Sequence, residues 1–318
     1  MAINNHFLIK SQIVPYMAPA LQHLLADLDE PYLEHLEEIR LRVAKPLILK
    51  GDNFVVTIDE NRRVREDLKR GYLVNEDDIF RTIASISENS LYAFEEEIKR
   101  GFITIPGGHR VGLAGQVMAQ GSEVRTIKNF SSISFRIARQ IPGCSNKLLD
   151  SIFASGDEKI KNTLIISPPR CGKTTILRDL ARIIATGSHL HQASNVVIID
   201  ERSEIAGSYL GVPQLDVGPQ TDVLDGCPKA IGIIMAIRAL SPAVIITDEI
   251  GQRADVEAIR ECLGAGVSII CSVHGAGIEE LARRPLFKEI LELRAFKVGV
   301  VLSRRHGPGS IERIIRWD

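Results

Sequence analysis

The stretch "LIISPPRCGKTTILRDLARIIATG", residues 164–187, predicts a strand, a tight turn and a helix in that order. Its centre follows the phosphate-binding pattern G-x-x-x-x-G-K-[ST] except at the first position, where Ser167 replaces glycine. An apolar run ends at Ile166, and the residues after Lys173 repeat apolar side chains at helical spacing. Because the motif requires a strand before it and a helix after it, this context favours a nucleotide-binding loop over a chance match.

The turn and the start of the helix form the predicted nucleotide site. Backbone N–H groups there would surround the β-phosphate of ATP, and the helix dipole favours anions at the same place. We expect Lys173 to reach the β- and γ-phosphate oxygens and Thr174 to bind Mg²⁺. A serine in the left-handed backbone conformation costs about 1–2 kcal/mol, so we expect the turn to differ at Ser167. The predicted cofactor-binding residues are Ser167, Pro168, Pro169, Arg170, Cys171, Gly172, Lys173, Thr174 and Thr175.

The second part of the chain alternates short apolar runs with helical patterns. These runs are continuously apolar, which is typical of parallel strands buried on both faces by helices. We therefore predict a doubly wound α/β domain over residues 146–318, with 311–317 as an edge strand. The predicted strands are 162–167, 195–200, 243–249, 267–275 and 297–304, and the predicted helices are 174–185, 229–240 and 255–266.

The first part of the chain, residues 1–145, mixes helical and strand patterns and predicts a smaller α+β domain. Alternating residues on either side of Pro106-Gly107-Gly108 predict a hairpin. The preceding helix is predicted to stop at Gly101, which follows two basic residues. The predicted helical segments are 18–28, 31–41 and 75–101, and the predicted strand pairs are 45–58, turned at 51–53, and 102–117.

Two of the apolar strands end in adjacent carboxylates. Because parallel strands converge at one edge of a sheet, both pairs could face the phosphates. We assign Asp248 to the Mg²⁺ shell, usually reached through water, with Glu249 beside it. Asp200 and Glu201 are candidates to orient or deprotonate the attacking water. The alternative for either pair is that it only caps the following helix. The predicted catalytic residues are Glu249, Glu201, Asp200 and His274, and the predicted metal-binding residues are Thr174 and Asp248.

A third strand ends at His274, where a side chain in the same crevice could donate a hydrogen bond to the γ-phosphate. A structural histidine is the alternative. Phosphoryl transfer commonly uses an arginine from a neighbouring subunit to stabilise charge. The candidates in the first part of the chain are Arg110, Arg125, Arg136 and Arg139, and the sequence does not choose among them.

The composition of the 318 residues is that of a globular protein of one large or two medium-sized domains. The net charge of −1 gives no general attraction to nucleic acid or anionic lipid. Five scattered cysteines without a C-x-x-C pair favour a reducing compartment over a disulfide framework or a zinc site. Residues 1–31 lack the pattern of a signal peptide, and no run is apolar for long enough to span a bilayer. We expect a cytoplasmic protein that contacts a membrane only peripherally, through partners.

The order of these elements resembles that of the secretion ATPases of type II and type IV systems. In that family a Walker A loop, an Asp box, a Walker B strand and a His box follow an α+β N-terminal domain. The corresponding positions here are 167–174, 200–204, 248–249 and 274. The resemblance implies a RecA-like P-loop ATPase domain, ATP and Mg²⁺ as cofactors, and a hexameric ring with ATP held between subunits. The Asp box reads Asp-Glu-Arg instead of the more usual Glu-Asp-Pro, which leaves the catalytic carboxylate open, and a tetracysteine zinc module is missing.

Three longer segments, 85–117, 198–230 and 245–259, are similar to the stage III sporulation protein AA family. This resemblance covers nearly the whole chain. It implies a Mg-dependent ATPase that powers or assembles a sporulation channel complex between mother cell and forespore. The implied partners are further copies of the chain and membrane proteins of that complex, and the implied location is the mother-cell cytoplasm.

Two other functions stay open from the residues alone. A RecA-like nucleic-acid-dependent ATPase would need basic or aromatic loops, and because aromatic residues make up only 5% of the chain we do not expect nucleic acid as a partner. An ATP-binding scaffold with little turnover is compatible with Ser167. The polar stretch 211–230, which contains Asp216, Asp222 and Asp225, is either a solvated connector or a functional loop at a ring pore or subunit boundary.

Overall fold

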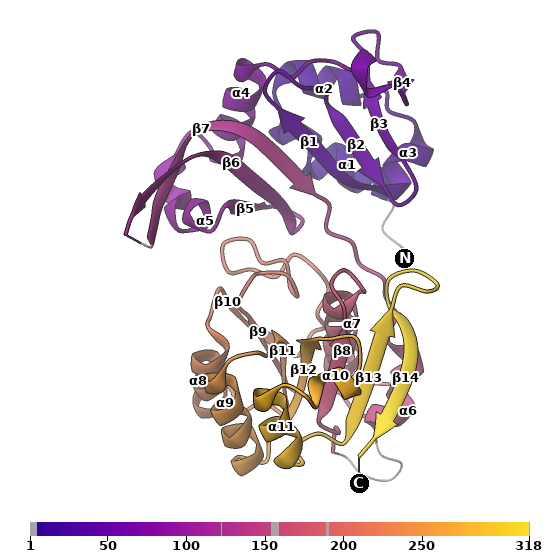
Figure 1. The fold of residues 1–318 in the computed structure, drawn as a ribbon, viewed down its shortest axis with the longest axis vertical. Coiled ribbons are helices and arrows are strands. Elements are labelled where there is room, and N and C mark those ends of the chain that lie inside the picture. Colours follow the sequence, from indigo (N-terminus) through magenta and orange to yellow (C-terminus); the bar gives the residue numbers. More distant parts are fainter. Residues whose placement is uncertain (1–4, 122, 154–158, 189–190, 318) are drawn as a thin grey trace. The chain divides into compact units, whose positions relative to one another are not determined.

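The computed structural model describes residues 5–121, 123–153, 159–188 and 191–317. Residues 1–4, part of the segment in which we expect no signal peptide, lie outside this description. The chain packs into two compact units, Met1–Arg139 and Gln140–Asp318, each built around one sheet (Figure 1). Along the chain, these units meet after Arg139. The predicted boundary between residues 145 and 146 refers to domains that fold independently, and it stays a prediction.

The first unit contains a seven-stranded sheet in the order β4-β3-β2-β1-β7-β6-β5, with every neighbouring pair antiparallel. Its strands are β1 Leu36–Arg42, β2 Ile48–Gly51, β3 Val55–Ile58, β4 Val64–Arg65, β5 Phe102–Ile105, β6 His109–Gln120 and β7 Glu123–Arg136. Its helices are α1 Asn5–Gln12, α2 Pro19–Leu25, α3 Glu30–His35, α4 Glu76–Ile86 and α5 Glu95–Lys99, with short 3₁₀ turns at Val14–Tyr16, Leu68–Arg70 and Leu91–Phe94.

Most local predictions for the first unit are confirmed. The pairs β2–β3 and β5–β6 form as expected, and Gly107 and Gly108 turn the second pair with positive φ angles of 87° and 76°. The predicted helix over 31–41 is wrong in its second half, where the chain is strand β1. From Ile39 onward, buried apolar and half-exposed basic residues alternate. This period of two matches a strand that is buried on one face and overrides the helical spacing before it.

The second unit also contains a seven-stranded sheet, in the order β10-β9-β11-β12-β8-β13-β14. All neighbours are parallel except β14, which lies antiparallel at the edge, as predicted for 311–317. Its strands are β8 Thr163–Ser167, β9 Val196–Asp200, β10 Thr221–Asp225, β11 Val244–Glu249, β12 Ser268–His274, β13 Val298–Ser303 and β14 Ser310–Arg316. Its helices are α6 Leu149–Ile152, α7 Lys173–Thr186, α8 Lys229–Ala239, α9 Arg253–Gly264, α10 Ile278–Leu281 and α11 Pro285–Glu292, with a 3₁₀ turn at Asn146–Leu148.

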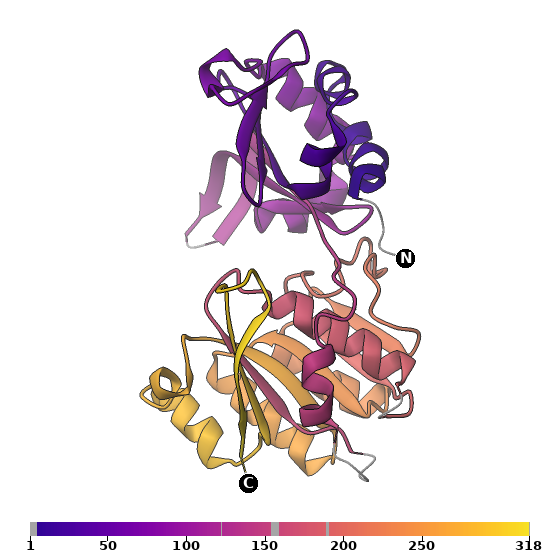
Figure 2. The same cartoon turned by 90° about the vertical axis from the view of Figure 1, so that its right-hand side faces the viewer.

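Helices cover both faces of this second sheet, and the arrangement can be followed in Figure 2. On one face, α6 and α7 pack on alternate strand residues such as Ile165 and Ile198. On the other face, α8, α9 and α11 pack on the residues between them, such as Leu164 and Val197. The strands are therefore buried on both sides, as their continuous apolar runs indicate. The predicted α/β, doubly wound fold is confirmed.

One strand of this sheet is not predicted from the sequence. Thr221–Asp225 lies within the polar stretch 211–230 and forms β10, which pairs in parallel with β9 at the edge of the sheet. Its residues are half-buried except Asp222, which is exposed, and Gly218 and Gly226 flank the strand with positive φ angles. A short edge strand with polar residues resembles a connector in sequence, because pairing with β9 and not an apolar run defines it.

In the part of the chain that the structure describes, no helix is both long enough and apolar enough to cross a bilayer.

Candidate nucleotide-binding site

The predicted phosphate loop joins the end of β8 to the start of α7. Ser167 is the last residue of β8, and it is fully buried in extended conformation. Ser167 therefore does not adopt the left-handed conformation that would be costly for a serine. The left-handed positions of the loop are Arg170 and Gly172, with φ angles of 59° and 83°. A serine fits at position 167 because that residue continues the strand, and its hydroxyl donates to the Pro168 carbonyl at 2.8 Å.

The turn between β13 and β14 lies against the phosphate loop. The backbone N–H of Gly309 donates to the carbonyl of Cys171 at 2.9 Å. A Cβ atom on Gly172 would lie 2.8 Å from the Gly309 nitrogen, so the close approach of the two backbones requires glycine at position 172. The sequence motif indicates a glycine at this position for contact with phosphate. It does not indicate that the turn at Gly309 also requires a glycine there.

The carboxyl ends of four neighbouring parallel strands bring the predicted site residues to one edge of the sheet. In the strand order, β9 carries Asp200, β11 carries Asp248 and Glu249, β12 carries His274 and β8 carries Ser167. Ser167 and His274 are direct register partners. Carboxyl ends of parallel strands are where open α/β sheets bind ligands. This edge therefore unites residues that are far apart in the chain.

Lys173 contacts an acid from this edge. Its ammonium nitrogen lies 3.8 Å from a carboxylate oxygen of Glu249, whose side chain is 44% exposed. As the first residue of α7, Lys173 belongs to the first turn, where backbone N–H groups have no partner within the helix. Free N–H donors, a lysine and a helix dipole at one point can hold an anion.

Asp248 is 9% exposed, and within the described residues its Oδ1 atom makes no hydrogen bond. Burial raises the pKa of Asp248 above its ordinary value, and the ammonium of Lys229, 3.4 Å from Oδ1, opposes that shift. Buried polar atoms normally have a partner, so an unsatisfied carboxylate oxygen here suits a site for a cation or its water. In the described residues no cluster of three metal-binding side chains exists. Mg²⁺ would therefore depend on phosphate, water, Asp248 and Thr174, a set of oxygen ligands that fits this ion.

The carboxylate of Asp200 faces its own loop. It is fully buried and accepts backbone N–H groups of Glu204, Ile205 and Ala206 at 2.8–2.9 Å. Burial raises the pKa of Asp200 to about 6, against the effect of these hydrogen bonds. From α7, the buried Arg178 binds the carbonyls of residues 204 and 205 in the same loop. Asp200 and Arg178 together fix the loop after β9.

Glu201, the next residue, is more accessible, with a side chain that is 33% exposed. It accepts a short hydrogen bond from Lys229, the first residue of α8. Sequence reasoning missed Lys229, Arg178 and Asp179. The available signal for the latter two is a charged pair within the apolar pattern of α7: Asp179 is buried and accepts hydrogen bonds from Gly143 and Ser145.

His274 is half-buried at the end of β12, and its backbone carbonyl accepts a hydrogen bond from Arg284. Among the candidate arginines of the first unit, Arg110 stacks on the ring of Phe102 at 3.5 Å. Arg139 binds Asp52 and the carbonyl of Leu36. Arg125 and Arg136 are exposed. The action of one of these arginines on a neighbouring subunit stays a prediction.

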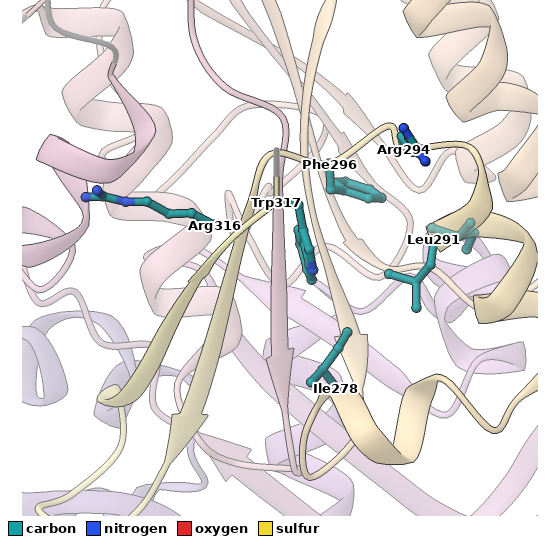
Figure 3. Close-up of a pocket in the computed structure, with 7 residues that line it drawn as sticks. Ile278, Leu291, Arg294, Phe296, Arg316 and Trp317 are labelled. Carbon is teal, nitrogen blue, oxygen red and sulfur yellow. The ribbon is translucent and has the colours of Figure 1, made fainter.

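A cavity of about 490 Å³ lies apart from these residues and is shown in Figure 3. Phe296 and Trp317 line it where β13 begins and β14 ends, away from the end of β8 that carries the phosphate loop. None of the predicted site residues contributes to its wall. The candidate nucleotide site is therefore the strand edge and not this cavity.

Comparison with solved structures identifies the fold. The ATPase DotB of Yersinia pseudotuberculosis superposes with a TM-score of 0.60 at 12% identity, over 93% of this chain and 79% of that one. The pilus retraction motor PilT, solved with bound ADP, superposes with a TM-score of 0.54 at 16% identity, over 84% and 74%. At such low identity the likeness shows the fold alone. It confirms the RecA-like domain, preceded by an α+β domain, that the resemblance implies.

Sequence comparison is more specific. Stage III sporulation protein AA of Bacillus subtilis (strain 168) is 40% identical over 310 residues, which cover 97% of this chain and 95% of the relative. The family model described as "Sporulation stage III, protein AA" matches residues 9–317. A match over nearly the whole chain includes both units and all predicted site residues. The chain therefore belongs to the sporulation stage III protein AA family.

Proposed function

We propose that this chain binds Mg²⁺–ATP at residues 167–175 and hydrolyses it. The observation that carries the proposal is Oδ1 of Asp248, which makes no hydrogen bond within the described residues and lies at the same strand edge as the Lys173–Glu249 ion pair. A buried carboxylate oxygen without a hydrogen bond is costly in a structural site. Beside a loop that can hold an anion, Oδ1 of Asp248 could bind the cation that accompanies a triphosphate.

The phosphate loop would bind the nucleotide through the N–H groups of the first turn of α7 and through Lys173. Thr174 and Asp248 would hold the metal, Asp248 through a water molecule. When bound, the metal neutralises charge on the phosphate oxygens. His274, the register partner of Ser167, would donate a hydrogen bond to the γ-phosphate. These contacts would position the γ-phosphate at the strand edge.

The base that activates water must have a carboxylate oxygen that can accept a proton. Asp200 is the least suited of the three candidates, because its carboxylate already accepts three backbone N–H groups in a buried site. Glu249 and Glu201 are partly exposed at the same edge and can accept a proton from water. We therefore propose Glu249 or Glu201 as the base. Asp200 instead holds the loop that follows β9.

In the cell, we propose that hydrolysis powers or assembles a sporulation channel complex between mother cell and forespore. The support is 40% identity to a stage III sporulation protein and a fold shared with a pilus retraction motor. The protein would work as a ring, expected to be a hexamer, on the mother-cell side of the membrane. Membrane proteins of the complex would be its partners, and an arginine of a neighbouring subunit would stabilise the transferred phosphoryl group.

The test is ATP hydrolysis by the purified chain, with Mg²⁺ and with EDTA, compared with Lys173→Ala. We expect Mg-dependent turnover that the variant lacks, and a specific rate that rises with protein concentration if sites are shared between subunits. ATP binding without turnover, alone or with membrane partners, would favour a scaffold instead. Stimulation by single- or double-stranded DNA at moderate salt would favour a nucleic-acid-dependent ATPase.

A further inference from the structure

Lys229 is a buried lysine between two acids of the candidate site. It is the first residue of α8 and is only 9% exposed. Its ammonium group donates a short hydrogen bond to Glu201 at the end of β9, and it lies 3.4 Å from Oδ1 of Asp248 at the end of β11. One side chain thus links the two acidic strand ends.

Stability alone does not account for a lysine at this position. A cation at the start of a helix faces the positive end of the helix dipole. Burying an ammonium group also carries a large desolvation cost, which an ion pair only roughly offsets, and well-packed apolar residues often serve stability as well or better. Burial lowers the pKa of Lys229, but the hydrogen bond to Glu201 and the charge of Asp248 outweigh it, so the side chain stays charged.

The backbone holds Lys229 firmly in this position. Pro228 precedes it with a φ angle of −56°, and α8 packs closely on β9 one turn later. A Cβ atom on Gly232 would lie 2.6 Å from Ile199 and 3.0 Å from the sulfur of Cys227. The start of α8 therefore cannot shift without losing the contact with β9. The ammonium group is held where both carboxylates can reach it.

The two contacts of Lys229 are unequal. Glu201 accepts a hydrogen bond, whereas Oδ1 of Asp248 is close enough for ionic attraction but makes no hydrogen bond within the described residues. A ligand could therefore bind Asp248 without breaking the hydrogen bond between Lys229 and Glu201. The positive charge of Lys229 also offsets part of the cost of burying the Asp248 carboxylate when no metal is bound.

We propose that Lys229 is a positioning residue of the nucleotide site: it holds Glu201 in place for the reaction and is the counter-ion that Asp248 exchanges for the hydrated metal. The inference rests on the proposed function. Asp248 loses a cationic neighbour when it accepts the metal shell, so Lys229 and the metal compete for it. Glu201 keeps its hydrogen bond throughout.

The test uses the full chain with Lys229→Met, which keeps the length of the side chain and removes the charge, and Lys229→Arg, which keeps the charge. Arg238→Met is the matched control, because it removes a positive charge from the exposed last turn of the same helix. Binding of Mn²⁺ in the presence of ADP, followed by electron paramagnetic resonance of the free ion, needs no turnover. The Mg²⁺-dependent rate of ATP hydrolysis is measured on the same samples.

In Lys229→Met we expect Mn²⁺ to bind at least about threefold more tightly, because a competing charge beside Asp248 is gone. We also expect kcat to fall by about tenfold or more, because Glu201 loses the group that orients it. Affinity for ADP in EDTA should not change. Lys229→Arg should keep the wild-type Mn²⁺ affinity and recover part of the rate, and Arg238→Met should match the wild type in both.

A purely structural role predicts a different pattern: a lower melting temperature, unchanged Mn²⁺ affinity in the folded fraction and no recovery with arginine. That pattern, or wild-type behaviour of Lys229→Met, overturns the inference while the proposed function stands. If the wild-type chain neither binds Mn²⁺ with ADP nor hydrolyses ATP, the proposed function fails and takes this inference with it.

Discussion

The ammonium nitrogen of Lys173 lies 3.8 Å from a carboxylate oxygen of Glu249. The lysine begins α7 and the glutamate ends β11, so the pair joins the proposed phosphate-binding residue to a proposed base. With nucleotide bound, Lys173 would exchange this carboxylate for phosphate oxygens, which leaves Glu249 free to accept a proton. If Glu249 is the base, binding and turnover depend on different members of one ion pair, and variants can separate them.

Replacing Lys173 by alanine is expected to weaken ATP and ADP binding by about 10- to 100-fold, because hydrogen bonds to charged groups contribute about 1.5–3 kcal/mol. Isothermal titration calorimetry with ADP measures the change. Lys288→Ala is the control: that lysine is exposed on α11, and its ion-pair partner, Glu292, lies 3.9 Å away on the same helix. Equal ADP affinity in the wild type and Lys173→Ala would rule out the phosphate loop as the site.

Replacing Glu249 or Glu201 by glutamine is expected to leave nucleotide affinity within a few-fold of the wild type and to lower the hydrolysis rate. The variant that removes the base should lose about 10²- to 10⁴-fold, because a positioned base contributes that factor. Phosphate release at saturating ATP measures it. Glu257→Gln, on the exposed face of α9, is the control. Normal turnover in both variants would show that neither residue is the base.

Replacing Gly172 by alanine is expected to disrupt the phosphate loop. The residue has a φ angle of 83°, which costs about 1–2 kcal/mol for alanine, and the new Cβ would meet the backbone nitrogen of Gly309 at 2.8 Å. We expect a lower melting temperature and loss of ADP binding. In Gly264→Ala, the matched control in α9, the added Cβ has open space, so stability should rise by about 0.4–1 kcal/mol. Normal ADP binding by Gly172→Ala would contradict the packing of the two turns.

Asp200 should make the second unit less stable as the pH rises from about 4 to about 6. Burial raises its folded pKa to about 6 from an ordinary 3.8, so the folded state holds a proton that the unfolded state has released. The free energy of unfolding should fall by about 3 kcal/mol over this window. Urea unfolding followed by fluorescence of Trp317, the single tryptophan, measures it. Asp200→Asn should remove this slope, and parallel pH curves for both proteins would contradict the assignment.

His109 should have the opposite effect on the first unit. Burial lowers its folded pKa to about 4 from an ordinary 6.5. Its Nδ1 accepts the N–H of Ala138, and its Nε2 lies 3.0 Å from the amide oxygen of Gln12, so the neutral ring fills both contacts. Between pH 6.5 and 4 only the unfolded state takes up a proton, which should cost the fold about 3 kcal/mol as the pH falls. Hydrogen exchange of β6 amides in the wild type and His109→Gln measures this loss, and identical pH dependence would refute it.

Local patterns in the sequence predict most of the second unit. Continuous apolar runs indicate its buried strands, and the residues around Lys173 indicate a strand, a phosphate loop and a helix. The parallel direction predicted for the strands also brings Asp248 and His274 to the edge that carries Ser167. The failures have local causes as well. At Leu36–Arg42 a helical spacing merges into an alternating one, and the short polar strand Thr221–Asp225 is defined by its neighbour β9 and not by its own residues.

The resemblance of three long segments predicts the family. Periodicity, turn chemistry and motif spacing are properties of neighbouring residues, and they predict the fold class and the residues that meet at the strand edge. The contacts that these residues make depend on tertiary packing. The Asp200 carboxylate binds the backbone of the loop that follows it, and Lys229 lies between two acids. Within the described residues, Oδ1 of Asp248 makes no hydrogen bond. The N–H of Gly309 donates to the carbonyl of Cys171. The contacts of Lys229 and Gly309 join segments that are far apart in the chain, and the packing of the second unit brings them together.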